Sequence, residues 1–154
     1  MSRAFFKESD GAEGQELPEL RLSPHRNLVT PDGFRQIEAQ VERLQAALSA
    51  ARAAQDRAEI ARIQRDLRYW SERLRTAEAV ASAPASGVVR FGSTFTLARS
   101  DGSRVTYQIV GEDEADPAAG RISYVSPIAR LVLGAAAGDA VALTDGAAEV
   151  LEIA

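Results

Sequence analysis

The sequence predicts an α+β protein in which an N-terminal antiparallel coiled-coil hairpin precedes a small, mostly antiparallel β-sheet domain with one short helix. Between residues 30 and 80, apolar side chains recur at alternating spacings of three and four, which is typical of helices that bury one stripe. From residue 88 onward the spacing changes to two, which is typical of strands. We therefore expect an extended or disordered tail at residues 1–27, the hairpin at 28–80, a linker rich in small residues at 81–87, and the sheet domain at 88–154.

Each arm of the predicted hairpin has a clear apolar stripe. Only a few residues separate the two stripes, so the helices must turn back on each other. Residues 30–32, Thr-Pro-Asp, are typical of a helix start, because Thr can cap and Pro fits the first position. The first arm should end near Ala53, and the second should run from Asp56 to about Val80. The stripes are Phe34, Ile37, Val41, Leu44, Leu48 and Ala51, then Ile60, Ile63, Leu67, Trp70, Leu74 and Ala77.

The turn of the hairpin carries charged side chains. Asp56 and Glu59 have the spacing of a capping pattern, in which Asp accepts a hydrogen bond from the third residue's N–H and Glu reaches back. This pattern accounts for both carboxylates without any ligand. Flanking cations either pair on a solvated helix surface or guide RNA phosphates or an acidic wall. These cations are Arg52, Arg57, Arg62 and Arg65.

The second domain shows period-two runs separated by turn signals. Asp-Gly pairs within residues 100–103 and 144–147 predict hairpin turns. Ser126 followed by Pro127, with a glycine at Gly134, predicts a short capped helix on the sheet. The acidic run at residues 112–116 is interpreted as a solvated loop rather than a cation site. The strands are expected at Val88–Phe91, Thr94–Ala98, Arg104–Val110 and Arg121–Val125.

Composition excludes several classes of protein. The net charge of −4 argues against a dedicated duplex-DNA binder. Cysteine is absent, so we expect no disulfide and no thiolate metal site, and His25 alone is a poor candidate for a metal ligand or a catalytic base. No apolar run is long enough to cross a bilayer and the first residues do not resemble a secretory signal, so we expect a cytoplasmic protein without a membrane partner.

Several segments in order resemble the Gre-type transcript-cleavage factors, the GreA/GreB family that acts on bacterial RNA polymerase. The resemblance extends from about Leu28 to Ile153 and is most specific in the second domain. It implies an FKBP-like fold for that domain, although nothing in the sequence marks a proline-binding pocket and a fold does not determine an activity. The segments are residues 28–33 (LVTPDG), 91–94 (FGST), 107–111 (YQIVG), 112–117 (EDEADP), 120–123 (GRIS), 126–130 (SPIAR), 138–139 (GD) and 150–153 (VLEI).

The resemblance also implies a function. The second domain would hold the rim of the polymerase secondary channel, facing it with Ser126, Pro127, Ile128 and Arg130. The hairpin would enter the channel, where Asp56 and Glu59 would help bind the second catalytic Mg²⁺ of the polymerase, whose ligands are typically carboxylates and water. The chain would have no cofactor of its own and would be an accessory factor, not an enzyme. Its partners would be RNA polymerase and the 3′ end of the nascent RNA, with DNA binding as a family property.

The chain also departs from that family. Each arm is shorter by roughly eight to ten residues, which is about 12–15 Å of helix, and Ile60-Ala61-Arg62 follows Glu59 where Asn and an aromatic residue are expected. An alternative is therefore a non-cleaving regulator that occupies the secondary channel without delivering a metal ligand. A third hypothesis is a partner-binding protein in which the hairpin serves only for oligomerisation. The first two hypotheses are compatible with a monomer, which we expect.

Overall fold

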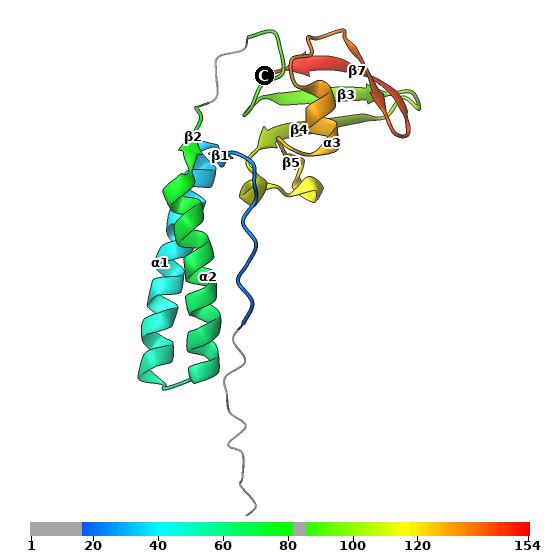
Figure 1. Cartoon of the computed structure of the whole chain (residues 1–154). Helices are drawn as coiled ribbons and strands as arrows, with labels where there is room; N and C mark the ends of the chain where they lie inside the picture. The colour runs from blue at the N-terminus through cyan, green and yellow to red at the C-terminus, as the bar shows by residue number, and fades with distance from the viewer. Residues whose placement is uncertain (1–16, 82–85) are drawn as a thin grey trace, which may run out of the picture.

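The computed structural model describes residues 17–81 and 86–154, which form a two-helix hairpin projecting from a curled β-sheet domain (Figure 1). The elements, in chain order, are β1 (Leu28–Val29), α1 (Pro31–Ala53), α2 (Arg57–Thr76), β2 (Glu78–Ala79), β3 (Thr94–Arg99), β4 (Arg104–Val110), the 3₁₀ helices η1 (Glu112–Glu114) and η2 (Pro117–Ala119), β5 (Arg121–Ser123), α3 (Pro127–Val132), β6 (Ala140–Leu143) and β7 (Gly146–Ile153). The predicted α+β class is confirmed.

The hairpin forms where the apolar stripes predict it. Thr30 caps α1 by accepting a hydrogen bond from the Gly33 N–H at 3.0 Å, and Pro31 occupies the first helical position. The α1 stripe is buried from Ile37 to Ala51. On α2 only Ile63 of the predicted stripe is fully buried, while its neighbours are half-buried against the same cluster. Burying these apolar side chains in one shared seam stabilises the paired helices.

The base of the hairpin differs from the prediction. α2 ends at Thr76, not near Val80, because the next residues pair with the strand that precedes α1. β1 and β2 are parallel and two residues long, with the Glu78 N–H donating to the Asn27 carbonyl and the Val80 N–H to the Val29 carbonyl, both at 2.8 Å. This pairing brings the entry and the exit of the hairpin side by side.

The second domain is a five-stranded sheet in the order β5-β4-β3-β7-β6. Neighbouring strands are antiparallel except β4 and β5, which are parallel. α3 covers one face of the sheet, and its Ala129 and Val132 are 0% exposed. The core consists of Val89, Phe95, Leu97, Ile109, Ile122, Ala129, Val132, Val141, Ala148 and Val150.

Most predicted sheet elements are confirmed. β4 has the predicted bounds, both hairpin turns form, and Ser126 and Pro127 begin α3. The predicted strand at residues 88–91 is wrong: that segment makes one isolated bridge, between Val88 and Ala136, although Val89 is buried in the core. Apolar residues there serve packing without a ladder partner. β5 also ends earlier than predicted, at Ser123, because a turn leads from it into α3.

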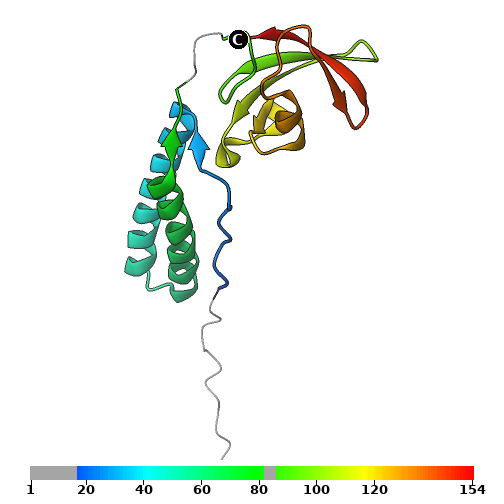
Figure 2. The same ribbon diagram turned by 45° about the horizontal axis from the view of Figure 1, so that its top comes forward.

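Residues 17–27 form no helix or strand and run beside the hairpin, in both views (Figures 1 and 2). Glu19 pairs with Arg68 of α2 at 2.5 Å, and Arg26 pairs with Glu78 at 2.5 Å. Residues 1–16 and 82–85 lie outside the described part of the chain. In the described part, no helix combines the length and the apolar character that a membrane span requires.

Candidate functional site

The tip of the hairpin is a tight turn at residues 54–56. Gln55 has a left-handed backbone, with φ of 56°, and the Asp56 N–H donates to the Ala51 carbonyl at 3.1 Å. Asp56 is the N-cap of α2, and its Oδ1 accepts from the Glu59 N–H at 3.0 Å. The capping interpretation is therefore confirmed for Asp56, which keeps its second carboxylate oxygen free of this bond.

Glu59 does not complete the capping box. Its carboxylate accepts from Arg62 instead, at 2.5 Å from Nη2 and 2.9 Å from Nε. These hydrogen bonds hold the pKa of Glu59 below its ordinary value, so Glu59 is ionised at neutral pH. Arg62 also reaches Asp66, 3.3 Å away. The second tip carboxylate is thus charged but already paired, by a cation that the sequence places one turn along α2.

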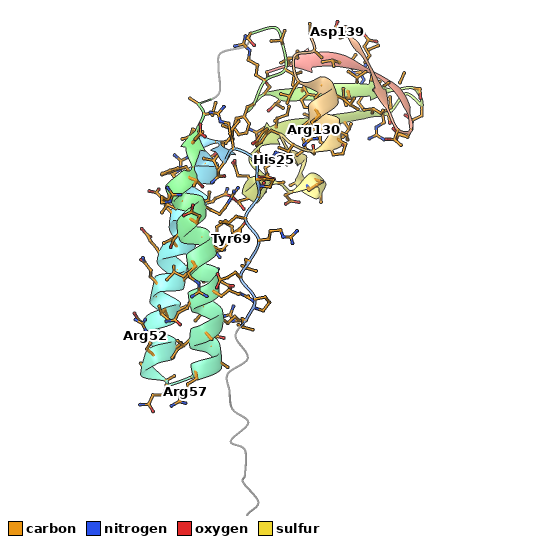
Figure 3. The ribbon with its side chains drawn as sticks, viewed as in Figure 1. His25, Arg52, Arg57, Tyr69, Arg130 and Asp139 are labelled. Atoms are coloured by element: carbon orange, nitrogen blue, oxygen red, sulfur yellow. The ribbon has the colours of Figure 1, made fainter. Side chains whose placement is uncertain are left out.

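Two cations at the tip have no ion-pair partner among residues 17–81 and 86–154. Arg52 and Arg57 are exposed at the far end of the hairpin, and neither makes an ion pair with another described residue (Figure 3). Arg65 differs, because it pairs with Asp66 at 2.8 Å. The tip therefore presents two exposed guanidinium groups beside the Asp56 carboxylate, and it offers binding partners to both phosphates and cations.

The tip has the ligand type that Mg²⁺ prefers but not a complete site. Asp56 and Glu59 supply hard carboxylate oxygens, which suit Mg²⁺. Within residues 17–81 and 86–154, no three His, Cys, Asp or Glu side chains gather closely enough to hold a metal ion. The two carboxylates therefore fit a metal only as additional ligands in a site that another molecule completes.

The surface around α3 contains the other predicted binding residues. Ser126 caps the helix, accepting from the Ala129 N–H at 3.3 Å. Ile128 is half-buried against the core, whereas Arg130 is exposed (Figure 3). Two apolar side chains that sequence reasoning missed are exposed here, Leu131 at 49% and Leu133 at 37%. A signal was present, because Leu131 lies off the helical face that Ala129 and Val132 bury.

The acidic run at residues 112–116 is not a solvated loop, so that prediction is wrong. Asp113 accepts from Arg73 Nε at 2.6 Å and from the Tyr69 hydroxyl at 3.1 Å, both on α2. Arg73 is 3% exposed, and Glu112 lies 3.9 Å from it. The run folds into η1 against the hairpin, because a buried guanidinium requires a carboxylate partner.

Glu114, the last residue of η1, reaches the other helix. Its side chain accepts from the Thr30 and Gly111 backbone N–H groups, each at 3.0 Å, and from the Thr30 hydroxyl. Thr30 is in turn the N-cap of α1. Adjacent carboxylates of η1 therefore bind both arms of the hairpin, and we call this set the joint: Thr30, Tyr69, Arg73, Asp113 and Glu114.

Two further residues singled out in the sequence lie near the joint. Trp70 packs against the hairpin cluster and meets Tyr69 edge-on, with ring centroids 5.2 Å apart. It also lines a small cavity with Asp113 and Glu114, which places it between the hairpin and the sheet domain. His25 is exposed, and its backbone N–H donates to the Ser23 hydroxyl at 3.2 Å.

Comparison with known proteins now gives the family. Residues 83–154 match the model described as "Transcription elongation factor, GreA/GreB, C-term". The transcription elongation factor GreA of Phenylobacterium zucineum is 33% identical over 146 residues, in a match that covers 81% of this chain and 93% of that protein. The chain belongs to the GreA/GreB family.

Another relative matches over a shorter stretch. The GreA of Vibrio parahaemolyticus is 56% identical over 70 residues, which cover 44% of this chain and 45% of that protein. The chain thus spans less than half of that relative. A solved structure, GreA factor homolog 1 (Gfh1) of Thermus thermophilus, is 26% identical, in a match that covers 84% of this chain and 99% of that chain, with a TM-score of 0.41.

Proposed function

We propose that this chain is a transcription elongation factor that binds RNA polymerase through its sheet domain and places the hairpin tip in the secondary channel. Membership of the GreA/GreB family supports the class. The observation that carries the proposal is the arrangement in Figure 3, where Arg52 and Arg57 mark the charged tip at the far end of the hairpin and Arg130 lies on the sheet domain. One end can therefore bind a large partner while the other reaches into it.

At the α3 end, the binding surface combines apolar and cationic groups. The exposed Leu131 and Leu133 flank a helix that also exposes Arg130. Exposed apolar side chains next to an Arg are typical of protein interfaces. This surface supports the predicted contact of Ser126, Pro127, Ile128 and Arg130 with the polymerase, with the two leucines added to it.

At the tip, we propose that Asp56 and Glu59 assist cleavage of backtracked RNA by the polymerase. When bound at the polymerase centre, Mg²⁺ would stabilise the attacking and leaving oxygens of the hydrolysis. The role of this chain is to present carboxylate oxygens to the metal. The Asp56 carboxylate is held in place by its capping hydrogen bond. The Glu59–Arg62 pair does not prevent this role, because ion pairs between exposed side chains of one helix are weak and exchange readily with solvent.

The second candidate is a regulator that occupies the channel without cleavage. Two observations favour it: Glu59 is paired by Arg62, and Arg52 and Arg57 leave the tip partly cationic. Length favours it as well. The match to the Phenylobacterium zucineum GreA aligns 146 positions, whereas 81% of 154 residues is about 125, so that relative has residues within the match that this chain lacks. We assign these missing residues to the two arms of the hairpin, so the rod would reach less deeply into the channel.

One assay separates the candidates. Purified backtracked elongation complexes are incubated with Mg²⁺ and the parent protein, Asp56→Asn or Glu59→Gln, and transcript 3′ ends are mapped. Asn is a matched control for the fold, because it caps a helix as well as Asp does but has no charge. Shortened transcripts with the parent, lost in both variants while binding persists, support cleavage. Binding without shortening supports the regulator, and absence of polymerase binding by the parent rejects both.

A further inference from the structure

The joint raises a question that the tip and α3 do not answer, namely what sets the direction of the hairpin. The two domains are connected in sequence by one segment of small residues at 81–87. Such a linker imposes little angular constraint by itself. The angle between the domains must therefore come from contacts made elsewhere.

These contacts are concentrated at η1 and attach to three separate segments. Asp113 binds α2 through Arg73 and Tyr69. Glu114 binds the N-cap of α1 through Thr30. Glu112 accepts from the Ser23 hydroxyl at 3.0 Å, in the segment that runs beside α2. Because η1 is attached to both helices and to the segment that contains Ser23, the hairpin cannot rotate about any single one of these contacts.

The close approach of η1 to α1 depends on two glycines. A Cβ placed on Gly33 would overlap the Glu114 carboxyl group, and one on Gly111 would overlap the Leu28 carbonyl. Gly33 lies within the first turn of α1, where alanine would ordinarily favour the helix. Glycine at this position weakens the helix locally, but it leaves the space that the Glu114 carboxyl group occupies.

We propose that Arg73, Asp113 and Glu114 are positioning residues, which fix the direction in which the hairpin leaves the sheet domain before the protein meets RNA polymerase. The direction of the hairpin is a property of the free protein, whereas its effect on transcription rests on the proposed function. The lever is long: the 23 residues of α1 span about 35 Å, so a rotation of about 10° at the joint displaces the tip by about 6 Å. Displacements far smaller than this impair the alignment of reacting groups.

The first measurement is a distance distribution in the free protein. Because the chain has no cysteine, Ala54→Cys at the tip and Ala137→Cys on the sheet domain, both exposed, give two unique sites for spin labels. We expect one narrow distance peak in the parent. Gly33→Ala and Asp113→Ala should broaden or shift it by about 6 Å or more. Asp145→Ala, which removes the exposed Arg99–Asp145 pair far from the joint, should leave it unchanged.

Gly33→Ala tests the joint without unfolding the hairpin, because alanine favours the helix while its Cβ displaces the Glu114 carboxyl group. Its circular dichroism should match the parent. An unchanged distance distribution in both joint variants overturns the inference, and so does a parent distribution that is already broad.

The second measurement adds RNA polymerase. Joint variants should bind it within about threefold of the parent but lose at least about tenfold of the effect on transcription per bound factor, whether that effect is cleavage or inhibition. Variants with a broadened distribution and a full effect overturn the positioning role. Failure of the parent to bind polymerase rejects the proposed function instead, and the distance distribution still decides whether the joint sets the direction.

Discussion

The Glu59 carboxylate at the tip of the hairpin is bound by the guanidinium of Arg62, with both of its oxygens accepting hydrogen bonds from nitrogens of the same side chain. The same arrangement recurs at the base of α2, where Arg75 binds Glu72 at 2.5 and 2.8 Å. The pKa values of both glutamates lie below the ordinary value because of these hydrogen bonds. α2 therefore contains two equivalent pairs, of which only one is at the tip.

This equivalence gives the first prediction. Arg62→Gln should raise the pKa of Glu59 toward its ordinary value of 4.5, because the hydrogen bonds that lower it are lost. Carboxyl carbon chemical shifts measured by NMR as a function of pH report this change. Glu72 serves as the internal control, since its partner Arg75 is untouched. A Glu59 titration that is identical in both proteins would show that the pair does not persist in solution.

The cap at the tip gives a second prediction. Asp56→Ala should lower the free energy of unfolding by about 1 kcal/mol, since the Glu59 N–H loses its acceptor, whereas Asp56→Asn should change it by only a few tenths. Urea denaturation followed by circular dichroism measures both. Equal losses in the two variants would mean that the carboxylate charge, not the cap, stabilises the turn.

Tyr69 gives a prediction about pH. Burial first, and then the Asp113 carboxylate beside it, raise the pKa of Tyr69 above its ordinary value of 10.0. The folded protein thus retains this proton longer than the unfolded chain, so the associated stability is fully present below about pH 10 and is lost as pH rises through the folded pKa. Melting temperatures between pH 8 and about 11.5 should fall less steeply for Tyr69→Phe.

Few other groups complicate that alkaline range. The sequence has no cysteine and one lysine, Lys7, so tyrosines dominate the titration. Tyr124 remains in the variant, and its pKa is also raised, mainly by burial and by Glu112. A residual slope is therefore expected for Tyr69→Phe. If parent and variant lose stability in parallel, the hydroxyl of Tyr69 is not held by Asp113 in solution.

The buried ion pair of the joint gives a fourth prediction. Asp113→Ala should lower the free energy of unfolding by about 3 kcal/mol, because Arg73 is left buried without its nearest carboxylate. Replacing both residues, as Arg73→Met with Asp113→Leu, should recover most of this loss. Asp145→Ala, at an exposed pair, should cost less than about 1 kcal/mol. A double variant as unstable as the single one would contradict this account.

The exposed leucine of α3 gives the last prediction. Leu131→Ser should leave the melting temperature within about 2 °C of the parent, because the side chain is 49% exposed and outside the core. It should nevertheless weaken RNA polymerase binding about tenfold, as expected for an apolar side chain in an interface. Leu97→Ser, at a fully buried position, is the contrasting control and should destabilise the fold. Unchanged binding with Leu131→Ser would place the interface elsewhere.

Local patterns in the sequence were sufficient for the hairpin and for most of the sheet. Pro31 and the apolar stripe define α1, and Asp56 is recognisable as a cap because its acceptor role depends on residues three positions away. The end of α2 was missed because β2 needs a partner, β1, that lies on the far side of the whole hairpin. The two strands are about 50 residues apart, so a short stretch of sequence never contains both of them.

The joint could not be predicted either, because its residues are also distant from one another in the sequence. Arg73 and Asp113 are 40 residues apart, and each alone reads as an ordinary exposed charge. Burial converts them into a structural pair, and burial is a property of the packed domains. Glycines gave the only local signal: Gly33 inside the first turn of a helix is unfavourable by itself, and its reason is contact with Glu114.

The two-residue parallel ladder of β1 and β2 has a consequence for how such proteins diversify. Because the chain enters and leaves the hairpin through neighbouring strands, both arms can gain or lose matched helical turns while every contact at the base stays in register. Each pair of inserted heptads would extend the rod by about 10 Å. Insertions and deletions can thus change the length of the hairpin without changing the surface that the sheet domain presents to a partner. A short hairpin on an unchanged base is one outcome of such changes.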